Sequence, residues 1–172
     1  WNYEGGLKSS WLDRRLQVNL SVFHYDYRNY QAFLFAGVGG VVLNRAAKIN
    51  GGELTVVAKP VKGLEVSAGA SYTHARVFEF PTDVTFNVVR KSVQPSYTPP
   101  WRLNAVARYS HSLFGGTLSE TATWTYRDPL YFSLRNFSAV RDDAHSKFGL
   151  GFDWLDSSEK LKIGVMIENV TN

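Results

Sequence analysis

Cysteine is absent from this chain of 172 residues, which excludes a disulfide framework and any thiolate metal site. Long apolar runs are absent too: the longest, residues 32–43, contains three glycines. A membrane-spanning helix needs about 20 apolar residues, so any crossing of a membrane has to use strands. The net charge of +4 comes from scattered Lys and Arg without a dense basic tract. This distribution argues against nucleic acid as a partner.

Catalytic motifs are also missing. The chain contains no G-x-S-x-G, no phosphate-binding glycine loop and no H-E-x-x-H. Asp142, Asp143 and His145 could bind a cation from a loop, but a solvated run of charges is the preferred interpretation. We therefore expect neither an enzyme nor a resident metal or cofactor.

What the chain does contain is a two-residue alternation of apolar and polar side chains. Successive side chains of a strand point to opposite faces, so such a segment separates two environments. In the clearest example, one face is mostly apolar and carries Leu118, Glu120, Ala122, Trp124 and Tyr126. The other face carries Thr117, Ser119, Thr121, Thr123, Thr125 and Arg127. Glu120 is the exception on the apolar face.

The alternation predicts eight strands, joined by connections of unequal length. The strands are expected at residues 2–10, 15–35, 41–59, 64–80, 101–113, 117–132, 145–155 and 161–169. Short turns are expected at 11–14, 37–40, 60–63, 114–116 and 156–160, and longer irregular connections at 81–100 and 133–144. Paired glycines, Gly51 and Gly52, predict a bulge or a bend within the third strand.

Three features favour lipid over a protein core on the apolar face. The predicted strands exceed the length of about 5–6 residues usual in soluble sheets. The opposite face is hydrophilic, as a hydrated lumen allows. Aromatic residues collect at both ends of the apolar face, with Trp11 and Trp154 at the short turns and Tyr72, Trp101 and Tyr126 at the long loops. These five residues are predicted to form the aromatic girdles of an all-β, antiparallel transmembrane β-barrel segment.

Five segments in order resemble the TonB-dependent outer-membrane receptors. YEGGLK at 3–8 is similar to the family's Y-E-x-G-x-K strand, and residues 16–31 are similar to its FYYDYKDLQ segment. Residues 44–54 resemble its NAGKARIKGVELE stretch, and 60–64 match its next turn. The closing IENVTN at 167–172 resembles the VENLTD element that precedes the last barrel strand.

The resemblance implies a barrel of about 22 strands with a plug in its lumen, of which this chain would supply about eight. Residues 1–172 would then be part of the barrel domain, without the plug, the segment that contacts the energy-coupling complex, and the last strand. The implied partners are outer-membrane lipid, the plug of the same receptor, the TonB energy-coupling complex and a small-molecule ligand. The implied location is the outer membrane of a Gram-negative bacterium.

Ligand contacts are expected from the long connections. The candidates combine cations with aromatic residues and are Arg90, Lys91, Tyr97, Tyr131, Arg135 and Arg141. Concave ligand sites pair aromatic surface with a few placed polar groups, and the cations would attract an anionic iron chelate.

The leading hypothesis is part of an energy-coupled receptor that imports a scarce ligand, such as a ferric siderophore, cobalamin or a glycan. Two alternatives stay open at this point. One is a small, autonomous eight-stranded barrel that acts as a structural outer-membrane protein. The other is a soluble carbohydrate-binding sandwich, which would bury the apolar face against a second sheet.

Overall fold

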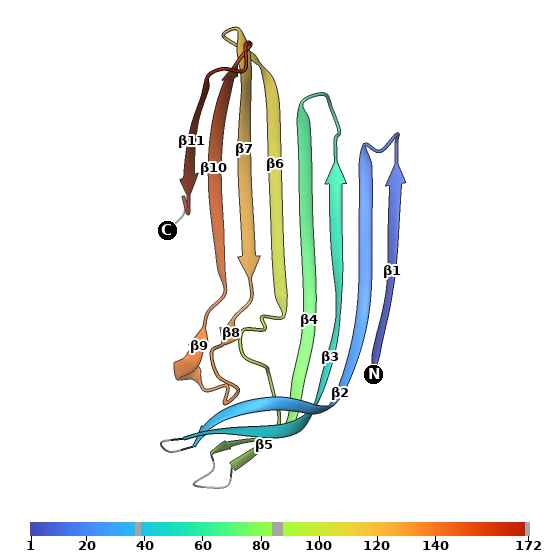
Figure 1. The fold of residues 1–172 in the computed structure, drawn as a ribbon, viewed down its shortest axis with the longest axis vertical. Coiled ribbons are helices and arrows are strands. Elements are labelled where there is room, and N and C mark those ends of the chain that lie inside the picture. The colour runs from blue at the N-terminus through green and yellow to red at the C-terminus, as the bar shows by residue number, and fades with distance from the viewer. Residues whose placement is uncertain (37–38, 84–87, 171–172) are drawn as a thin grey trace.

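The computed structural model describes residues 1–36, 39–83 and 88–170. They form one long antiparallel sheet with a small second sheet at one end (Figure 1). Along the main sheet the order is β1 (Asn2–Trp11), β2 (Leu16–Ala36), β3 (Gly39–Ala58), β4 (Leu64–Asp83), β6 (Trp101–Leu113), β7 (Gly116–Arg127), β10 (His145–Asp156) and β11 (Lys162–Glu168), and β5 (Val88–Val93) pairs with β4. The second sheet pairs β8 (Leu130–Tyr131) with β9 (Arg141–Asp142), and a 3-10 turn, η1 (Ser138–Val140), precedes β9.

The sheet is open in the described residues, because β1 and β11 lie at its two edges and do not pair with each other. No helix in this part of the chain has the length and apolar character to cross a membrane.

Strand register joins the predicted alternation of single strands into two continuous faces. One row of Cα partners crosses six strands through Val18, Val56, Ala68, Ala105, Trp124 and Phe148. The adjacent row runs through Asn19, Thr55, Gly69, Asn104, Thr125 and Lys147 on the other side. We call these sides the apolar face and the polar face. In the described chain no second layer covers the apolar face, where Phe148 is 43% and Ile163 is 56% exposed.

Tight turns join the strands at the end opposite the small sheet. Phe114 and Gly115 form the two-residue connection of β6 and β7, with φ of 49° and 71°. Two positive φ values are typical of a type I′ turn, whose twist matches that of the flanking strands. This end of the sheet is called the turn end below, and the other is called the loop end.

Most predicted strands are present with bounds within one or two residues, but the strand predicted at 117–132 is too long. β7 ends at Arg127, because Pro129 cannot donate a ladder hydrogen bond. Asp128 closes the pairing: its N–H donates to the Trp101 carbonyl at 2.9 Å, and its carboxylate accepts from the Trp101 N–H at 3.1 Å. Leu130 and Tyr131 then belong to the separate small sheet.

The connections also differ from prediction. The irregular stretch predicted at 81–100 contains β5, a proline-free segment with three valines that pairs with an extension of β4 to Asp83. β-branched residues favour strands, and the clustered prolines of this stretch follow β5. The stretch predicted irregular at 133–144 holds η1 and β9. Of the turn predicted at 37–40, residues 37–38 lie outside the described residues, while Gly39 and Gly40 already belong to β3.

Of the two alternatives predicted at Gly51 and Gly52, a bulge or a bend, the bulge is wrong. Both glycines pair in unbroken register with β2 and β4. A Cβ on Gly51 would lie 2.4 Å from the Phe23 ring and 2.4 Å from the Tyr72 carbonyl oxygen. Gly51 therefore makes room for the Phe23 ring across the pair. The irregularity lies instead in β2, where the register shifts between Tyr27 and Tyr30.

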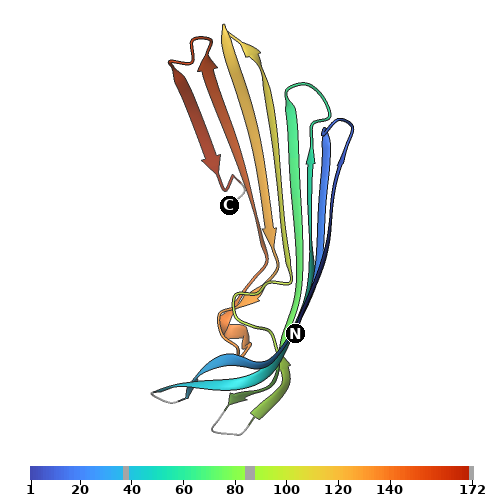
Figure 2. The same cartoon turned by 45° about the vertical axis from the view of Figure 1, so that its right-hand side comes forward.

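Beyond this shift the β2–β3 ribbon bends away and crosses the loop end, beside β5 and below the small sheet (Figures 1 and 2). The bend creates the hydrophobic core of the described chain. It joins β2, β3, β4, β5 and the connection after β8 through Ala32, Leu34, Ala47, Val77, Phe80, Val93 and Leu134. The core therefore lies at the loop end, outside the single-layered part of the sheet.

Replacing Gly51 with Ala is expected to destabilise the main sheet. The added Cβ meets both a ring and a backbone oxygen, and overpacking of this kind costs about 1–3 kcal/mol. Gly5→Ala is the matched control, since its nearest neighbour is the Val22 side chain at 4.0 Å. The urea midpoint of each variant is measured on the full-length protein, with the heat-dependent shift of the folded form on a gel as the readout. Equal midpoints for the two variants would contradict this account of Gly51.

Candidate functional site

A cavity of about 470 Å³ opens at the loop end between the tip of β2 and the segment 132–140. Five aromatic residues line it, with Tyr30, Phe33 and Phe35 from β2 and Phe132 and Phe137 from the segment. The polar lining includes Gln31, Ser96, Ser133 and Arg135. Aromatic walls with a few convergent polar groups are the usual composition of a small-molecule site.

The core positions the two walls of this cavity. Along β2, Ala32 and Leu34 are buried with 0% and 4% exposure. The intervening Phe33 and Phe35 point to the other side and stack edge to face with ring centroids 4.9 Å apart. On the opposite wall, Leu134 is 7% exposed and belongs to the same core. Both walls are therefore fixed to one packed cluster.

Arg135 connects these walls directly. Its guanidinium Nη2 donates a hydrogen bond to the backbone carbonyl of Phe35, which is 100 positions away in the sequence. Because Arg135 also lines the cavity, its charge is held beside the aromatic side chains. A guanidinium has five donors, so one bond to a carbonyl leaves others for an anionic ligand.

Asn136 joins the connection after β8 to the segment before β6 through two hydrogen bonds. Its side-chain Oδ1 accepts from the Gln94 N–H at 2.7 Å, and its Nδ2 donates to the Gln94 carbonyl at 2.9 Å. The side-chain amide thus pairs with a backbone unit as a neighbouring strand would. Next to it, the Tyr97 N–H donates to the Tyr131 carbonyl at 2.9 Å, and the Tyr97 and Phe132 rings lie 5.6 Å apart.

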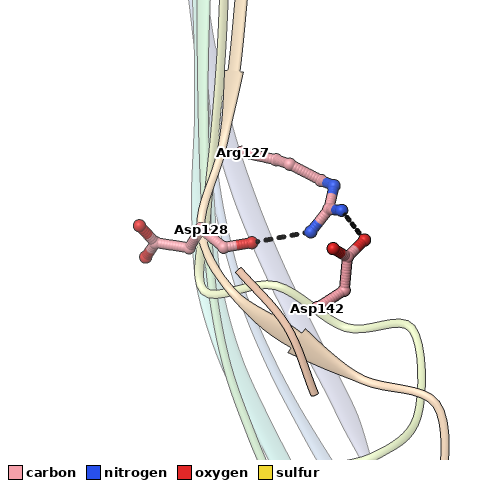
Figure 3. A network of polar contacts seen from close by, with 3 residues as sticks. All are labelled: Arg127, Asp128 and Asp142. Atoms are coloured by element: carbon pink, nitrogen blue, oxygen red, sulfur yellow. Dashed lines mark hydrogen bonds and ion pairs between the residues drawn. The ribbon is translucent and has the colours of Figure 1, made fainter. Parts of the chain in front are cut away.

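An ion pair holds the small sheet on the polar face. Arg127, at the end of β7, pairs with Asp142 of β9 and donates from Nη1 to the Asp128 carbonyl at 3.2 Å (Figure 3). Its side chain is only 19% exposed, so solvent screens this pair less than a free surface pair. The Asp128 carboxylate points the other way in Figure 3 and accepts from the Tyr126 hydroxyl at 2.7 Å.

The predicted ligand residues fall into two groups. Arg135 lines the cavity, while Tyr97, Tyr131 and Arg141 lie around it: Tyr131 and Arg141 are Cα partners in the small sheet, and Arg141 pairs with Asp143 at 3.4 Å. Arg90 and Lys91 are exposed on β5 and are not part of the cavity lining.

Sequence reasoning missed the aromatic residues of the cavity, because the alternation places residues 30–35 at the far end of the strand predicted at 15–35. The signal that could have found them is the length of that strand. Twenty-one residues in β2 exceed the roughly 9–11 that cross a bilayer, so the distal half of a strand this long is not needed for a crossing and is free to form a site.

The five aromatic residues predicted for girdles lie at opposite ends of the apolar face. Trp11 ends β1, and the Trp154 indole donates to the Leu113 carbonyl at 2.9 Å, both at the turn end. Tyr72 and Trp101 are Cα partners with rings 4.8 Å apart, and Tyr126 lies nearby at the loop end.

The acidic run weighed for a cation is engaged with arginines, since Asp142 pairs with Arg127 and Asp143 with Arg141. Within the ranges that the structure describes, no group of three or more His, Asp and Glu side chains is placed to hold a metal.

Comparison with known proteins gives one family and a set of similar folds. The family described as TonB dependent receptor-like, beta-barrel matches residues 1–170. Similar solved structures include the ferric yersiniabactin uptake receptor FyuA of Yersinia pestis, at 16% identity and a TM-score of 0.76 over 98% of this chain. The siderophore receptor PiuA of Acinetobacter baumannii has 16% identity and a TM-score of 0.75 over 99%. The ferric preacinetobactin receptor BauA of the same species has 15% identity and a TM-score of 0.72 over 99%.

The chain spans about a quarter of each of these structures, 24%, 24% and 25% of their lengths. At these identities the structural likeness shows the fold, an antiparallel barrel segment that is open in the part of the chain that the structure describes. The family match covers nearly the whole chain. The members of this family are receptors and transporters of the Gram-negative outer membrane, and it is not an enzyme family. The chain therefore belongs to the TonB-dependent receptor-like β-barrel family.

Proposed function

We propose that this chain is part of the barrel domain of an outer-membrane receptor that imports a ferric siderophore with energy from the inner membrane. The observation that carries the proposal is the aromatic cavity with Arg135 at the loop end. The three similar structures are a ferric yersiniabactin uptake receptor, a siderophore receptor and a ferric preacinetobactin receptor, which favours an iron chelate over cobalamin or a glycan.

In this proposal residues 1–172 are one partial barrel domain, and the plug and the segment that contacts the TonB complex belong to the same receptor. The apolar face contacts outer-membrane lipid, and the polar face lines the lumen around the plug. Trp11, Tyr72, Trp101, Tyr126 and Trp154 form the interfacial girdles. The receptor transports its ligand without catalysing a reaction on it.

Two structural features weaken the alternatives. A small autonomous barrel requires its first and last strands to pair, whereas β1 and β11 lie at opposite edges of the described sheet. A soluble sandwich requires a second sheet over the apolar face, whereas Phe148, Leu150 and Phe152 are each at least 40% exposed.

The cavity would bind the chelate through stacking and charge. The aromatic rings of Phe33, Phe35 and Phe132 offer flat apolar surface for an aromatic chelator, and Arg135 offers donors for its anionic oxygens. Arg141 and Tyr131 lie in the adjacent small sheet, and Arg90 and Lys91 are exposed on β5. The three outer cations, Arg141, Arg90 and Lys91, would attract the anion before it enters.

Arg135→Gln in the full-length receptor is expected to weaken binding of an anionic ferric tris-catecholate about tenfold, because a hydrogen bond to a charged group is lost. Binding of a neutral ferric trihydroxamate should change less. Fluorescence quenching or calorimetry with both chelates measures the effect. Arg135→Lys, which keeps the charge, separates electrostatics from the bond to Phe35.

Lys62→Gln is the matched control for this experiment, since Lys62 is a cation in the turn between β3 and β4 at the opposite end of the sheet. Arg90→Gln should produce a smaller effect than Arg135→Gln, because Arg90 lies outside the cavity lining. Unchanged affinity for the anionic chelate in Arg135→Gln would refute the assignment of the cavity.

The lipid assignment of the apolar face predicts opposite outcomes for two neighbouring valines. Val56 is on the apolar face between Val18 and Ala68, and Val57 is on the polar face between Gln17 and Ser67. Val56→Arg should destabilise the full-length receptor in phospholipid vesicles by about 2–4 kcal/mol, and Val57→Arg should be tolerated. Denaturant unfolding in vesicles measures both, and equal destabilisation would contradict the assignment.

A further inference from the structure

The apolar face is bounded by the row of Trp154 at the turn end and the row of Tyr72 and Trp101 at the loop end. Between these rows, Glu120 is the one carboxylate on this face in the described strands. Its Cα partners are aromatic on both sides: Tyr109 on β6 and Phe152 on β10, exposed by 41% and 42%. Among the described residues no side chain or backbone group forms a hydrogen bond or ion pair with the Glu120 carboxylate. Placing a charged carboxylate on an apolar surface is costly without a donor or a cation beside it, and here such a partner would come from outside the described chain.

The depth of Glu120 limits what this partner can be. Glu120 is four residues from Gly116, where β7 begins at the turn end. At about 3.4 Å per residue, and with the tilt usual for barrel strands, it lies roughly 10 Å above the turn. This is two residues further into the face than Leu118, whose Cα partner is Trp154. The carboxylate is therefore within reach of lipid headgroups while its neighbours contact acyl chains.

A shallow groove of about 210 Å³ extends from this carboxylate. Its lining includes Ala107 and Ala122, Cα partners one row further into the face, whose small side chains leave the surface hollow. Tyr109, Leu150 and Phe152 are larger and also line it. The groove thus combines an apolar trough with one anionic group toward the turn end.

We propose that this groove binds a phospholipid with a primary ammonium headgroup, whose ammonium donates to the Glu120 carboxylate and whose acyl chain lies over Ala107 and Ala122. The inference rests on the proposed placement of the apolar face in lipid. A carboxylate repels a headgroup that carries only phosphate and attracts one with an ammonium. The flanking rings add a second preference for the cation, since ammonium groups are attracted to aromatic faces.

The test uses the full-length receptor in nanodiscs with equal amounts of phosphatidylethanolamine and phosphatidylglycerol. Native mass spectrometry then counts the lipids that remain bound to the receptor after it is released from the nanodisc. Wild type should retain phosphatidylethanolamine preferentially, and Glu120→Gln should lower that preference roughly fivefold, because the charged partner of the hydrogen bond is removed. Glu53→Gln, a change of the same kind on the polar face between Ser21 and Ser71, should leave it unchanged.

A second measurement requires no variant. Replacing phosphatidylethanolamine with its N-acetylated form removes the ammonium charge and should abolish the preference of wild-type receptor. Equal retention of the two lipids by wild type, or a preference that survives in Glu120→Gln, would overturn the proposal. Failure of the receptor to retain lipid of either kind, or to insert into the bilayer, would instead count against the membrane placement on which the proposal rests.

Discussion

The rest of this structure depends on the demand that backbone N–H and C=O groups be hydrogen-bonded along one continuous sheet, a demand that is strictest for strands in the proposed hydrocarbon layer. An antiparallel sheet meets this demand only while its register is continuous, and a slip of one residue would turn a whole strand's apolar side chains inward. In the described strand pairs, register shifts occur at Tyr27/Tyr30 and at Pro81/Asp83. Both lie beyond the rows that form the apolar face, so the wall itself keeps one alternation from β1 to β11.

A wall of this kind has no core of its own, and that explains where the buried residues are. The chain concentrates them at the loop end, where Val77, Phe80 and Val93 pack in one cluster with Ala32 and Leu34 of the bent β2–β3 ribbon. The same cluster fixes Leu34 and Leu134, which line the cavity from opposite sides. The candidate binding site therefore depends on tertiary packing at the loop end, while the wall depends on register. Strands β2, β3 and β4 run through both parts, and the ion pair of Arg127 and Asp142 adds a second connection between them (Figure 3).

This division also explains what could be predicted from the sequence. β6 and β10 were predictable because periodicity of two is a local property that each strand carries in its own residues. The small sheet of β8 and β9 was not, since its two-residue strands depend on contacts such as Arg127 with Asp142 that no local pattern encodes. Arg135 was identified as a loop cation, but Phe33 and Phe35 reach it only because β2 bends after Tyr27. The role of Gly51 was not predictable, because the Phe23 ring that requires a glycine at this position is on the neighbouring strand.

Exceptions to the alternation therefore differ in how they are accommodated. Phe23 is an apolar residue on the polar face, and the protein accommodates it internally: the ring covers Gly51 and stacks on Tyr25 with centroids 5.2 Å apart. Glu120 is a charged residue on the apolar face, and the described chain provides aromatic neighbours but no donor. An apolar side chain needs only shape from its neighbours, whereas a carboxylate needs a donor. An exception that the fold leaves unsatisfied points to a molecule outside the fold, and with the proposed membrane placement of this face that molecule is a lipid.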